Sequence, residues 1–455
     1  MTLVPPPIPR AAGSFPLLGH AIQLMRDNLG FIASLREDYG PLVEITLQPG
    51  TRTIVVQDPD LIRTMLVDLA PTLDKGRFFE KMGHILGDSV VTAAGQEHVR
   101  KRRQLQPAFA RSEIARYVDI MRNEVTAATD TWQPGQSLDV REAMVKLSLD
   151  MLAKTVFSDS LDEETFRRLR HDLSVVMTGV GARIMLPDWA ERVPLPFNRR
   201  FNESRDAVRA TIHQAVDDLQ ATGHDTGDML SLLLRATDPD TGEPLTTDQI
   251  CSEILTLAVA GTETTASVLS WILYELARHP DIEARVLDEL HEVLGERPID
   301  FADVTQLPYL RRVVTEATRL HHTGWLVTRR TTTEIRLGEW TLPAGTELAY
   351  CQHALHRDPT LFPNPLAFDP DRWLDSAQPS PTGAFLPFGA GKHKCIGDHF
   401  ALTELITAIA TIVRRVRFGL SAGLTVRPVA RATVRPRTLV MTVQPREEYT
   451  RPEAT

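Results

Sequence analysis

A mainly α-helical protein with a minor β portion is the fold class that the sequence predicts, from three observations. Apolar residues recur with helical spacing through most of residues 97–295. Short alternating segments flanked by Pro and Gly lie instead near the two ends of the chain. No internal repeat or low-complexity linker divides the 455 residues. We therefore expect a single domain over residues 1–455.

The expected strands fall into separate groups along the chain. Leu42–Leu47 and Thr53–Asp58 alternate in polarity near the N-terminus, and Trp325–Leu348 forms a second strand-rich stretch. The stretch TVRPRTLVMTVQP near the C-terminus predicts a final hairpin. These segments define β-rich portions at 1–70 and 325–350, and helical portions at 97–320 and 385–420.

Composition excludes several classes of function. The formal net charge of −9 argues against a general affinity for nucleic acid, which depends on clustered Lys and Arg. Cys251, Cys351 and Cys395 are far apart and odd in number, so they predict neither a disulfide framework nor a structural zinc site. The N-terminal sequence lacks the pattern of a signal peptide or membrane anchor. We expect a soluble, cytoplasmic protein.

The longest expected helix begins at Thr246, where Thr246 and Gln249 fit a capping box, and it continues to Pro280. Its middle is almost wholly apolar, which indicates a helix that passes through the protein core. Within it, the sequence AGTETT combines a glycine with a polar run, and both disturb an apolar helix. These groups either serve a ligand or consist of a packing glycine and hydroxyls that bond to carbonyls one turn earlier.

The stretch FLPFGAGKHKCIGDHFA places Cys395 directly before an amphipathic helix pattern. The helix dipole and the free amides at such a position favour thiolate over thiol. Gly389 and Gly391 allow a tight turn beneath the sulfur, and Gly397 allows close approach of a flat ligand. A large planar ligand fits this arrangement. From these residues alone, a nucleophilic cysteine and an inert buried cysteine remain alternatives.

The pattern Phe388-Gly389-x-Gly391-x-x-x-Cys395-x-Gly397 resembles the haem-binding loop of the cytochrome P450 family. Three further segments resemble the family in order and separation: AGTETT as the oxygen-activating helix motif, Glu316-x-x-Arg319, and Arg372 in FDPDRW. An ExxR pair alone is an ordinary surface ion pair, so the joint pattern carries the argument. The resemblance implies an α-rich lobe and a small β-rich lobe, with haem between the central helix and the helix after the cysteine.

The same resemblance implies haem b (iron protoporphyrin IX) as the cofactor, with Cys395 as the metal ligand. His98, Arg102, Arg329 and His393 are expected to meet the haem propionates, and Arg330 is the rival of Arg329. The other residues expected to contact the cofactor are Ala260, Gly261, Phe388, Gly389 and Gly397. Glu316, Arg319 and Arg372 are expected to be structural.

A thiolate ligand favours cleavage of the O–O bond, so the implied reaction is monooxygenation with O2 as co-substrate. Glu263 and Thr264 resemble the acid and alcohol that relay protons to oxygen. No flavin or iron–sulfur pattern is present, so we expect electrons from NAD(P)H through ferredoxin reductase and ferredoxin. The ferredoxin would meet a basic patch, for which a solvated charged face is the alternative: Arg100, Lys101, Arg103, Arg111, Lys392 and Lys394.

The substrate is expected to be a hydrophobic small molecule, because the residues expected at the pocket are apolar or small. They are Phe78, Phe79, Ile85, Leu257, Ala258, Ala260 and Trp325–Thr328. Several stretches are similar to bacterial enzymes that oxidise sesquiterpenes and related terpenoids. A fatty-acid or polyketide hydroxylase, a peroxide-driven hydroxylase and a non-catalytic haem sensor are the alternatives; the Glu263–Thr264 pair speaks against the last two. His322 stands where the family usually carries proline, and surface exposure is the expected reason.

Overall fold

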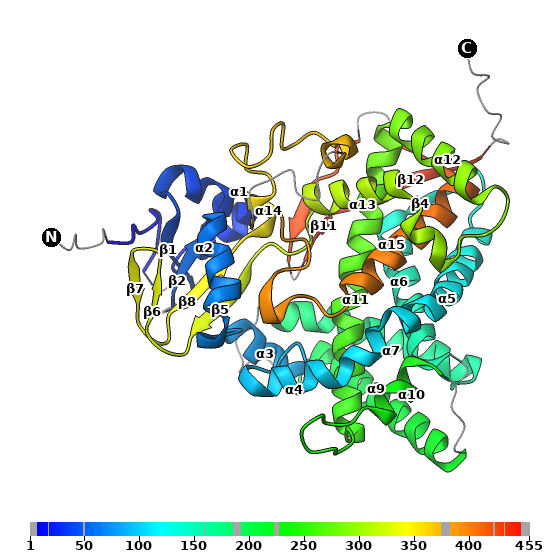
Figure 1. The fold of residues 1–455 in the computed structure, drawn as a ribbon, viewed down its shortest axis with the longest axis horizontal. Helices are drawn as coiled ribbons and strands as arrows, with labels where there is room; N and C mark the ends of the chain where they lie inside the picture. Colours follow the sequence, from blue (N-terminus) through cyan, green and yellow to red (C-terminus); the bar gives the residue numbers. More distant parts are fainter. Residues whose placement is uncertain are drawn as a thin grey trace.

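The computed structural model describes residues 7–16, 18–48, 51–158, 160–184, 193–222, 227–374, 383–421, 424–431 and 433–446. Helices form most of the molecule, and a smaller β portion lies next to the N-terminus (Figure 1). The predicted fold class, mainly α with a minor β portion, is confirmed.

The described helices are α1 (Ala21–Tyr39), α2 (Pro59–Arg63), α3 (Arg77–Leu86), α4 (Gly95–Leu105), α5 (Arg111–Asp130), α6 (Val140–Phe157), α7 (Glu163–Ile184), α9 (Pro196–Thr222), α10 (Met229–Arg235), α11 (Thr247–Arg278), α12 (Pro280–Leu294), α13 (Pro308–Leu320), α14 (Gln352–Leu355) and α15 (Asp398–Arg415). The strands are β1 (Leu42–Gln48), β2 (Thr51–Val56), β3 (Leu73–Asp74), β4 (Ser137–Asp139), β5 (Val327–Thr331), β6 (Ile335–Leu337), β7 (Trp340–Leu342), β8 (Glu347–Tyr350), β9 (Val416–Gly419), β10 (Pro428–Ala430), β11 (Val434–Pro436) and β12 (Val440–Pro445).

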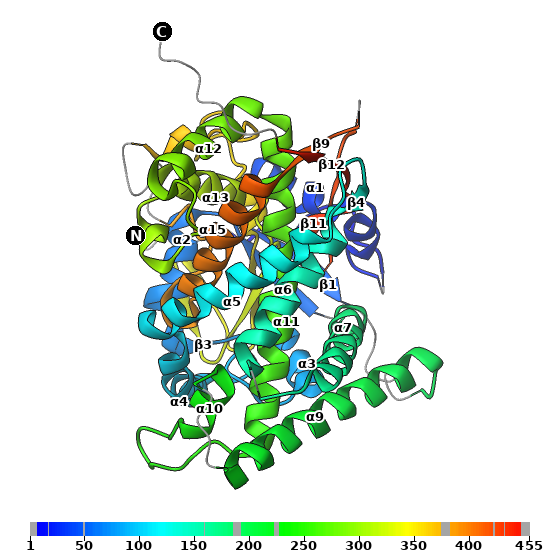
Figure 2. The same cartoon turned by 90° about the vertical axis from the view of Figure 1, so that its right-hand side faces the viewer.

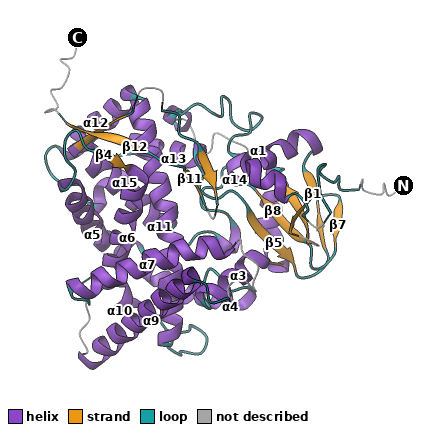
Figure 3. Ribbon diagram, turned by 180° about the vertical axis from the view of Figure 1, so that it is seen from behind, coloured by secondary structure: helices purple, strands orange, loops and turns teal. Residues whose placement is uncertain are grey.

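The largest sheet joins the two β-rich portions that the sequence predicts. Its strand order is β1-β2-β8-β5-β3, in which β2 and β8 run parallel and the other neighbours run antiparallel. This sheet lies at the end of the molecule next to the N-terminus, whereas β4 and β12 lie at the opposite end (Figure 3). The pairing of β2 with β8 therefore brings residues 53–55 against residues 347–349, which come after α13 and before α15.

Helix α11 runs through the centre of the helical portion (Figure 2). Thr246 and Gln249 form the predicted capping box, and the helix ends at Arg278, just before Pro280 begins α12. Both termini thus follow from local sequence signals. Helix α11 packs against α6, α9, α13 and α15, and its apolar residues form part of the main hydrophobic core.

The predicted final hairpin is wrong. Strands β11 and β12 both form, but β11 pairs with β10, and β12 lies between β4 and β9. The intervening residues cross from one sheet to the other, as the Leu439 carbonyl accepts a hydrogen bond from the Val140 amide. Met441 and Val443 on β12 are buried against the helical core. That burial stabilises a pairing that local sequence does not reveal.

No helix among these described ranges has the length and apolar character needed to span a membrane.

Candidate active site

Cys395 lies in a tight turn directly before α15. Its amide donates a hydrogen bond to the Phe388 carbonyl at 2.9 Å, and the Lys394 amide donates to the Gly391 carbonyl at 3.0 Å. Gly389 and Gly391 have φ of 71° and 67°, the left-handed region that favours glycine. A Cβ at Gly391 would also overlap the carbonyl oxygen of Leu66. The two glycines are therefore what allows the turn to present the cysteine.

Cys395 is the accessible member of the three cysteines, since Cys251 and Cys351 are buried. Surrounding protein nevertheless raises the pKa of the Cys395 thiol, against the opposing effects of the Gly397 amide, Arg102 and Lys394. In the protein alone, burial thus opposes the thiolate that the helix terminus is expected to favour. Coordination by a metal ion deprotonates a thiol outright, so Cys395 would be a thiolate when it binds one.

The middle of α11 is accessible, although the helix is buried on both sides of this segment. Ala260 is exposed and Gly261, Glu263 and Thr264 are partly exposed, although Thr262 among them is buried. The Thr265 hydroxyl donates to a Glu404 carboxylate oxygen at 3.4 Å, which marks where α11 contacts α15. Ala260 lies about 8 Å N-terminal to that contact along α11, at 1.5 Å per residue. Cys395 lies directly before α15, so both accessible positions precede this contact along their own segments.

The two residues expected to relay protons have specific partners. The Thr264 hydroxyl donates to the Ala260 carbonyl at 2.7 Å, the bond to the preceding turn that the sequence leaves as an alternative. Glu263 forms an ion pair with Arg435 on β11 at 3.4 Å. Its side chain is about one-third exposed, so the carboxylate can exchange protons with solvent.

His98 and His393 lie against each other beside the cysteine turn. His98 Nε2 lies 3.4 Å from His393 Nδ1, and the ring centroids are 4.3 Å apart. The pKa of His98 is lowered to about 3 and that of His393 to about 2, mainly by burial. Lys75 and Arg329 also act to lower both pKa values, and Arg102 acts to lower that of His98. His98 Nδ1 and His393 Nε2 are buried and have no hydrogen-bond partner within the described residues.

Arg329 is buried, and burial lowers the pKa of its guanidinium. Its side chain donates to the Thr328 carbonyl at 2.7 Å. Arg330, the rival position, forms ion pairs with Asp74 and Glu80 instead. The structure thus commits Arg330 to protein carboxylates, and it places Arg329 near the two histidines.

These residues belong to a cationic cluster, which we define as Lys75, His98, Arg102, Arg329, Lys392 and His393. Neighbouring charges of the cluster lower the pKa values of Lys75, His98, Lys392 and His393, and in the described part of the chain none of the six forms an ion pair. Lys75 and Arg329 are buried and Arg102 and Lys392 are partly exposed, and positive charges so close together without carboxylates are unfavourable unless an anion offsets them. Arg102 also donates to the Lys394 carbonyl, which ties α4 to the cysteine turn. The cluster and Cys395 therefore fit a haem, whose propionates are anionic and whose iron accepts a thiolate.

Lys75 is a member of this cluster that sequence reasoning missed. It follows β3 directly, and its ammonium donates to the carbonyls of Val90 and Val91 at 2.7 Å each. Burial lowers its pKa to about 7. A lysine after a short strand carries no recognisable local signal, so only the fold could place it here.

Glu316, Arg319 and Arg372 meet in a buried network. Arg319 donates to both carboxylate oxygens of Glu316 at 2.9 and 2.8 Å, and Arg372 Nε lies 3.3 Å from Glu316. The Trp373 indole donates to the same carboxylate at 2.9 Å, a partner that sequence reasoning missed. Arg319 further donates to the carbonyls of His356 and Pro365, so this network joins α13 to the loop that follows α14.

The expectation that His322 is exposed is wrong. The ring is buried, and its Nε2 lies 3.1 Å from the carbonyl of Pro387, directly before Phe388 of the cysteine turn. Burial lowers its pKa, so the ring is neutral and donates one hydrogen bond while accepting another. His322 therefore fixes the approach of the chain to the cysteine turn.

The expected basic patch also needs correction. Lys101 has no exposed side-chain surface and pairs with Asp88 and Glu97. Arg100 pairs with Glu97 and Asp238, and Lys394 with Asp398. Arg103 lies 3.7 Å from Asp240, and Arg111 lies over the ring of Phe301. Much of the positive charge is therefore neutralised locally, and Lys101 does not belong to the surface.

Two of the expected pocket residues, Ala258 and Ile85, are buried. Ala258 lines a small apolar cavity between α6, α7 and α11, beside Leu152 and Leu173. Ile85 is buried in the main core, whereas Phe78 and Phe79 are partly exposed and pack edge to face.

The architecture and the site together define a protein that holds a flat, anionic cofactor between its central helix and a cysteine turn. A family model described as Cytochrome P450 matches residues 6–444. The chain therefore belongs to the cytochrome P450 family, whose members contain haem and use O2 for monooxygenation with reducing equivalents from NAD(P)H. It is a cytochrome P450 monooxygenase.

Curated relatives include cyclooctat-9-en-7-ol 5-monooxygenase from Streptomyces melanosporofaciens, which is 42% identical and covers 91% of this chain and 90% of the relative. Pentalenene oxygenase from Streptomyces avermitilis is 35% identical, with coverage of 93% and 94%. Among solved structures, the haem domain of cytochrome P450DA matches with a TM-score of 0.85 at 25% identity, over 97% of this chain and 98% of that chain.

Proposed function

We propose that this enzyme inserts one oxygen atom from O2 into a terpenoid, a sesquiterpene-like hydrophobic molecule of bacterial natural-product biosynthesis. The relatives that act on cyclooctat-9-en-7-ol and pentalenene support this substrate class. Apolar positions around the accessible segment of α11 agree with a hydrophobic substrate.

The observation that carries the function is the cationic cluster beside the accessible thiol of Cys395. In this proposal Cys395 ligates the haem iron, and the cluster holds the propionates. Ala260, Gly261, Phe388, Gly389 and Gly397 are the further residues assigned to cofactor contact. Bound haem supplies the activation of O2, which a thiolate ligand promotes.

Glu263 and Thr264 are assigned to proton transfer. Arg435 holds the Glu263 carboxylate at one face of α11, and Thr264 presents its hydroxyl at the turn that contains Gly261. In this assignment Glu263 takes a proton from solvent. The Thr264 hydroxyl then donates toward the pocket where O2 would bind, once it turns away from the Ala260 carbonyl. Glu316, Arg319 and Arg372 hold the surrounding fold and do not contact the reacting atoms.

The electron donors are proposed to be a ferredoxin and its ferredoxin reductase, in the cytoplasm. Arg103 on α4 and Lys394 in the cysteine turn are exposed, and Lys392 in the same turn is partly exposed. These cations can steer an acidic partner toward the haem edge, an effect that weakens as salt rises.

The test is the absorption spectrum of purified, dithionite-reduced protein with and without carbon monoxide. A strongly red-shifted Soret band is the expected result for a thiolate ligand, and Cys395→Ser abolishes it. A band typical of histidine-ligated haem would refute the assignment of Cys395. Titration with pentalenene, with lauric acid as the control for a fatty-acid hydroxylase, then tests the substrate class by the spin-state shift. Turnover that requires NADPH and both redox proteins excludes a non-catalytic sensor. The absence of turnover with hydrogen peroxide alone excludes a peroxide-driven hydroxylase.

A further inference from the structure

The peptide groups of one residue, Val90, are held from two sides by buried ionisable side chains. Its amide donates to both carboxylate oxygens of Glu253, at 2.9 and 3.1 Å. Its carbonyl accepts from the Lys75 ammonium at 2.7 Å. Glu253 belongs to α11 and Lys75 to the cationic cluster, so Val90 connects the central helix to that cluster.

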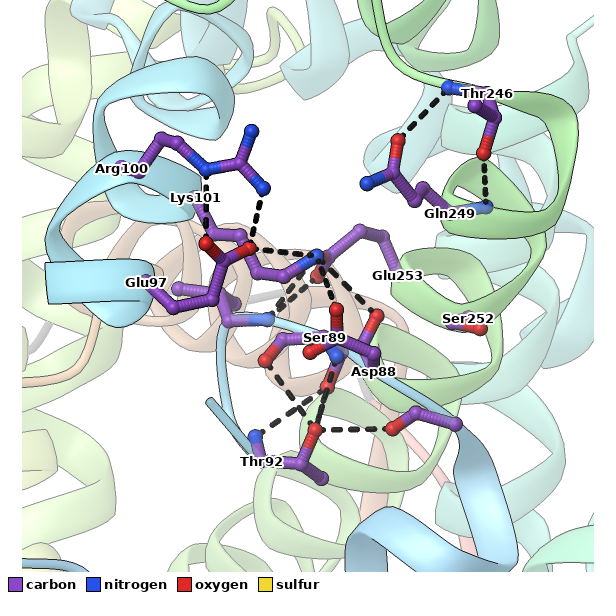
Figure 4. Close-up of polar contacts among 12 residues, drawn as sticks. Asp88, Ser89, Thr92, Glu97, Arg100, Lys101, Thr246, Gln249, Ser252 and Glu253 are labelled. Atoms are coloured by element: carbon purple, nitrogen blue, oxygen red, sulfur yellow. Dashed lines mark hydrogen bonds and ion pairs between the residues drawn. The ribbon is translucent and has the colours of Figure 1, made fainter. Parts of the chain in front are cut away.

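Glu253 also belongs to a network with Lys101, which Figure 4 shows between α4 and α11. Lys101 Nζ lies 3.1 Å from Asp88, 3.7 Å from Glu97 and 4.0 Å from Glu253. The side chains of Lys101 and Glu253 have no exposed surface, whereas Asp88 and Glu97 are well exposed. Glu253 is therefore the one carboxylate of this network that solvent cannot screen.

Burial raises the pKa of Glu253 to about 7, although the Val90 amide, Lys101 and Lys75 act to lower it and Asp88 acts to raise it. The charge of Glu253 consequently changes near neutral pH. When the carboxylate is ionised, its hydrogen bond from Val90 is charge-assisted and stronger than the bond to a neutral acid.

Lys75 responds to the same charge. Burial and the neighbouring cations lower its pKa to about 7, and Glu253 acts in the opposite direction. Two of the three ammonium N–H groups go to Val90 and Val91, and the third has no acceptor in the described portions of the chain. An ionised Glu253 thus favours the ammonium form of Lys75 and fixes the loop carbonyls that orient it.

The loop itself is stiff enough to transmit this restraint. The Ser89 amide donates to the Thr92 hydroxyl at 2.9 Å, and the Ala93 amide donates to the Ser89 carbonyl at 2.8 Å. Gly87 approaches α11 so closely that a Cβ there would overlap the Ser252 hydroxyl.

We propose that Glu253 is a positioning residue of the cationic cluster, which acts through Val90 to hold Lys75 as an oriented ammonium against a carboxylate of the cofactor. The proposal rests on the assignment of the cluster to the haem propionates. It goes beyond that assignment, because Glu253 itself does not touch the cofactor.

The experiment measures release of haem from the purified holoenzyme into excess apomyoglobin, between pH 6 and 8.5. The variants are Glu253→Gln, Lys75→Met and the double variant; Glu97→Gln is the matched control, because Glu97 contacts Lys101 but not Val90. At pH 8 each single variant is expected to release haem about ten-fold faster, the effect of losing one charge-assisted hydrogen bond. The double variant is expected to match Lys75→Met alone, since Glu253 acts through Lys75.

The pH dependence separates positioning from packing. Below pH 7 wild-type Glu253 takes up a proton, so the ratio of the Glu253→Gln rate to the wild-type rate should fall toward one. A ratio that stays constant across this range, additive effects in the double variant, or an equal effect of Glu97→Gln would each overturn the proposal.

Lys101→Met provides a second test if Glu253→Gln does not fold. Removing this cation raises the pKa of Glu253. The pH below which haem release accelerates should therefore be higher in Lys101→Met than in wild type. An unchanged midpoint would refute the proposal. A wild-type protein that never retains haem would instead refute the proposed function. Failure of the proposed function and failure of this proposal are therefore distinguishable.

Discussion

Arg435 on β11 forms an ion pair with Glu263 on α11 at 3.4 Å, so the C-terminal strands reach the residue assigned to proton transfer. Both side chains are partly buried, and burial lowers the pKa of Arg435. The guanidinium therefore holds a carboxylate that would otherwise choose among several rotamers.

Removing the Arg435 charge should impair proton delivery. Arg435→Gln is expected to lower the product formed per NADPH by roughly three- to ten-fold, the effect of about 1 kcal/mol. Arg435→Lys, which keeps a cation, should lose less. Product and hydrogen peroxide are measured together in the ferredoxin-supported reaction. Equal coupling in wild type and Arg435→Gln would show that this ion pair has no part in catalysis.

Removing the Thr264 hydroxyl should uncouple electron consumption from product formation. Thr264→Ala deletes the group that donates to Ala260, and it is expected to divert reducing power to hydrogen peroxide with at least about ten-fold less product. Thr264→Ser keeps the hydroxyl and serves as the control. The proton-relay assignment fails if the alanine variant remains fully coupled.

The Glu316–Arg319 pair should matter for stability far more than an exposed pair of the same spacing. Both side chains of Glu316–Arg319 have no exposed surface, whereas those of Glu164–Arg167 are more than half exposed. Arg319→Ala strands a buried carboxylate and should reduce the free energy of unfolding by about 3–5 kcal/mol. Arg167→Ala should cost less than about 1 kcal/mol. Denaturant unfolding measures the free energy of unfolding of the two variants. Similar losses of stability in both would contradict this prediction.

Glu404 should make stability depend on pH. Burial raises its pKa to about 8, with the Thr265 hydroxyl acting in the opposite direction. The folded protein therefore holds a proton that the unfolded chain releases near pH 4.5, so this contribution is complete at low pH and is lost as pH rises through 8. A pKa that differs by one between the folded and unfolded protein corresponds to about 1.4 kcal/mol. Thermal melts from pH 5 to 9 should show a shallower decline for Glu404→Gln than for wild type; parallel curves would contradict this.

Gly391→Ala should disrupt the cysteine turn, because the new Cβ meets the Leu66 carbonyl in addition to the strain of a positive φ. Gly345→Ala is the matched control, since Gly345 has φ of 82° but faces open space. Strain alone costs about 1 kcal/mol. We expect loss of haem only for Gly391→Ala, measured by the ratio of Soret to protein absorbance. Haem retention equal to that of Gly345→Ala would refute the role of this contact.

Features set by neighbouring residues could be predicted from the sequence, and features set by tertiary contacts could not. The capping box at Thr246 and the glycine turn before Cys395 involve residues a few positions apart. The burial of Lys101 depends on α11, which lies about 150 residues later, and helical spacing alone leaves it indistinguishable from exposed Arg103.

The site shows the same division. The motif around Cys395 predicted its position, but the pKa of the thiol depends on how much protein surrounds it. Lys75 follows the short strand β3, and Arg435 lies on β11. Neither segment has a motif of its own, so only the assembled fold could place these residues at the site.

The parallel pairing of β2 with β8 joins Thr53 to Glu347, about 290 residues further along the chain. A ribosome synthesises the chain from the N-terminus, so β1 and β2 emerge as a two-stranded hairpin whose β2 edge has no partner yet. That edge stays open until Tyr350 has left the exit tunnel, after nearly all helices have been made. The helical core can therefore begin to assemble during translation, whereas the five-stranded sheet must close late and over a long loop, the step that topology makes slow.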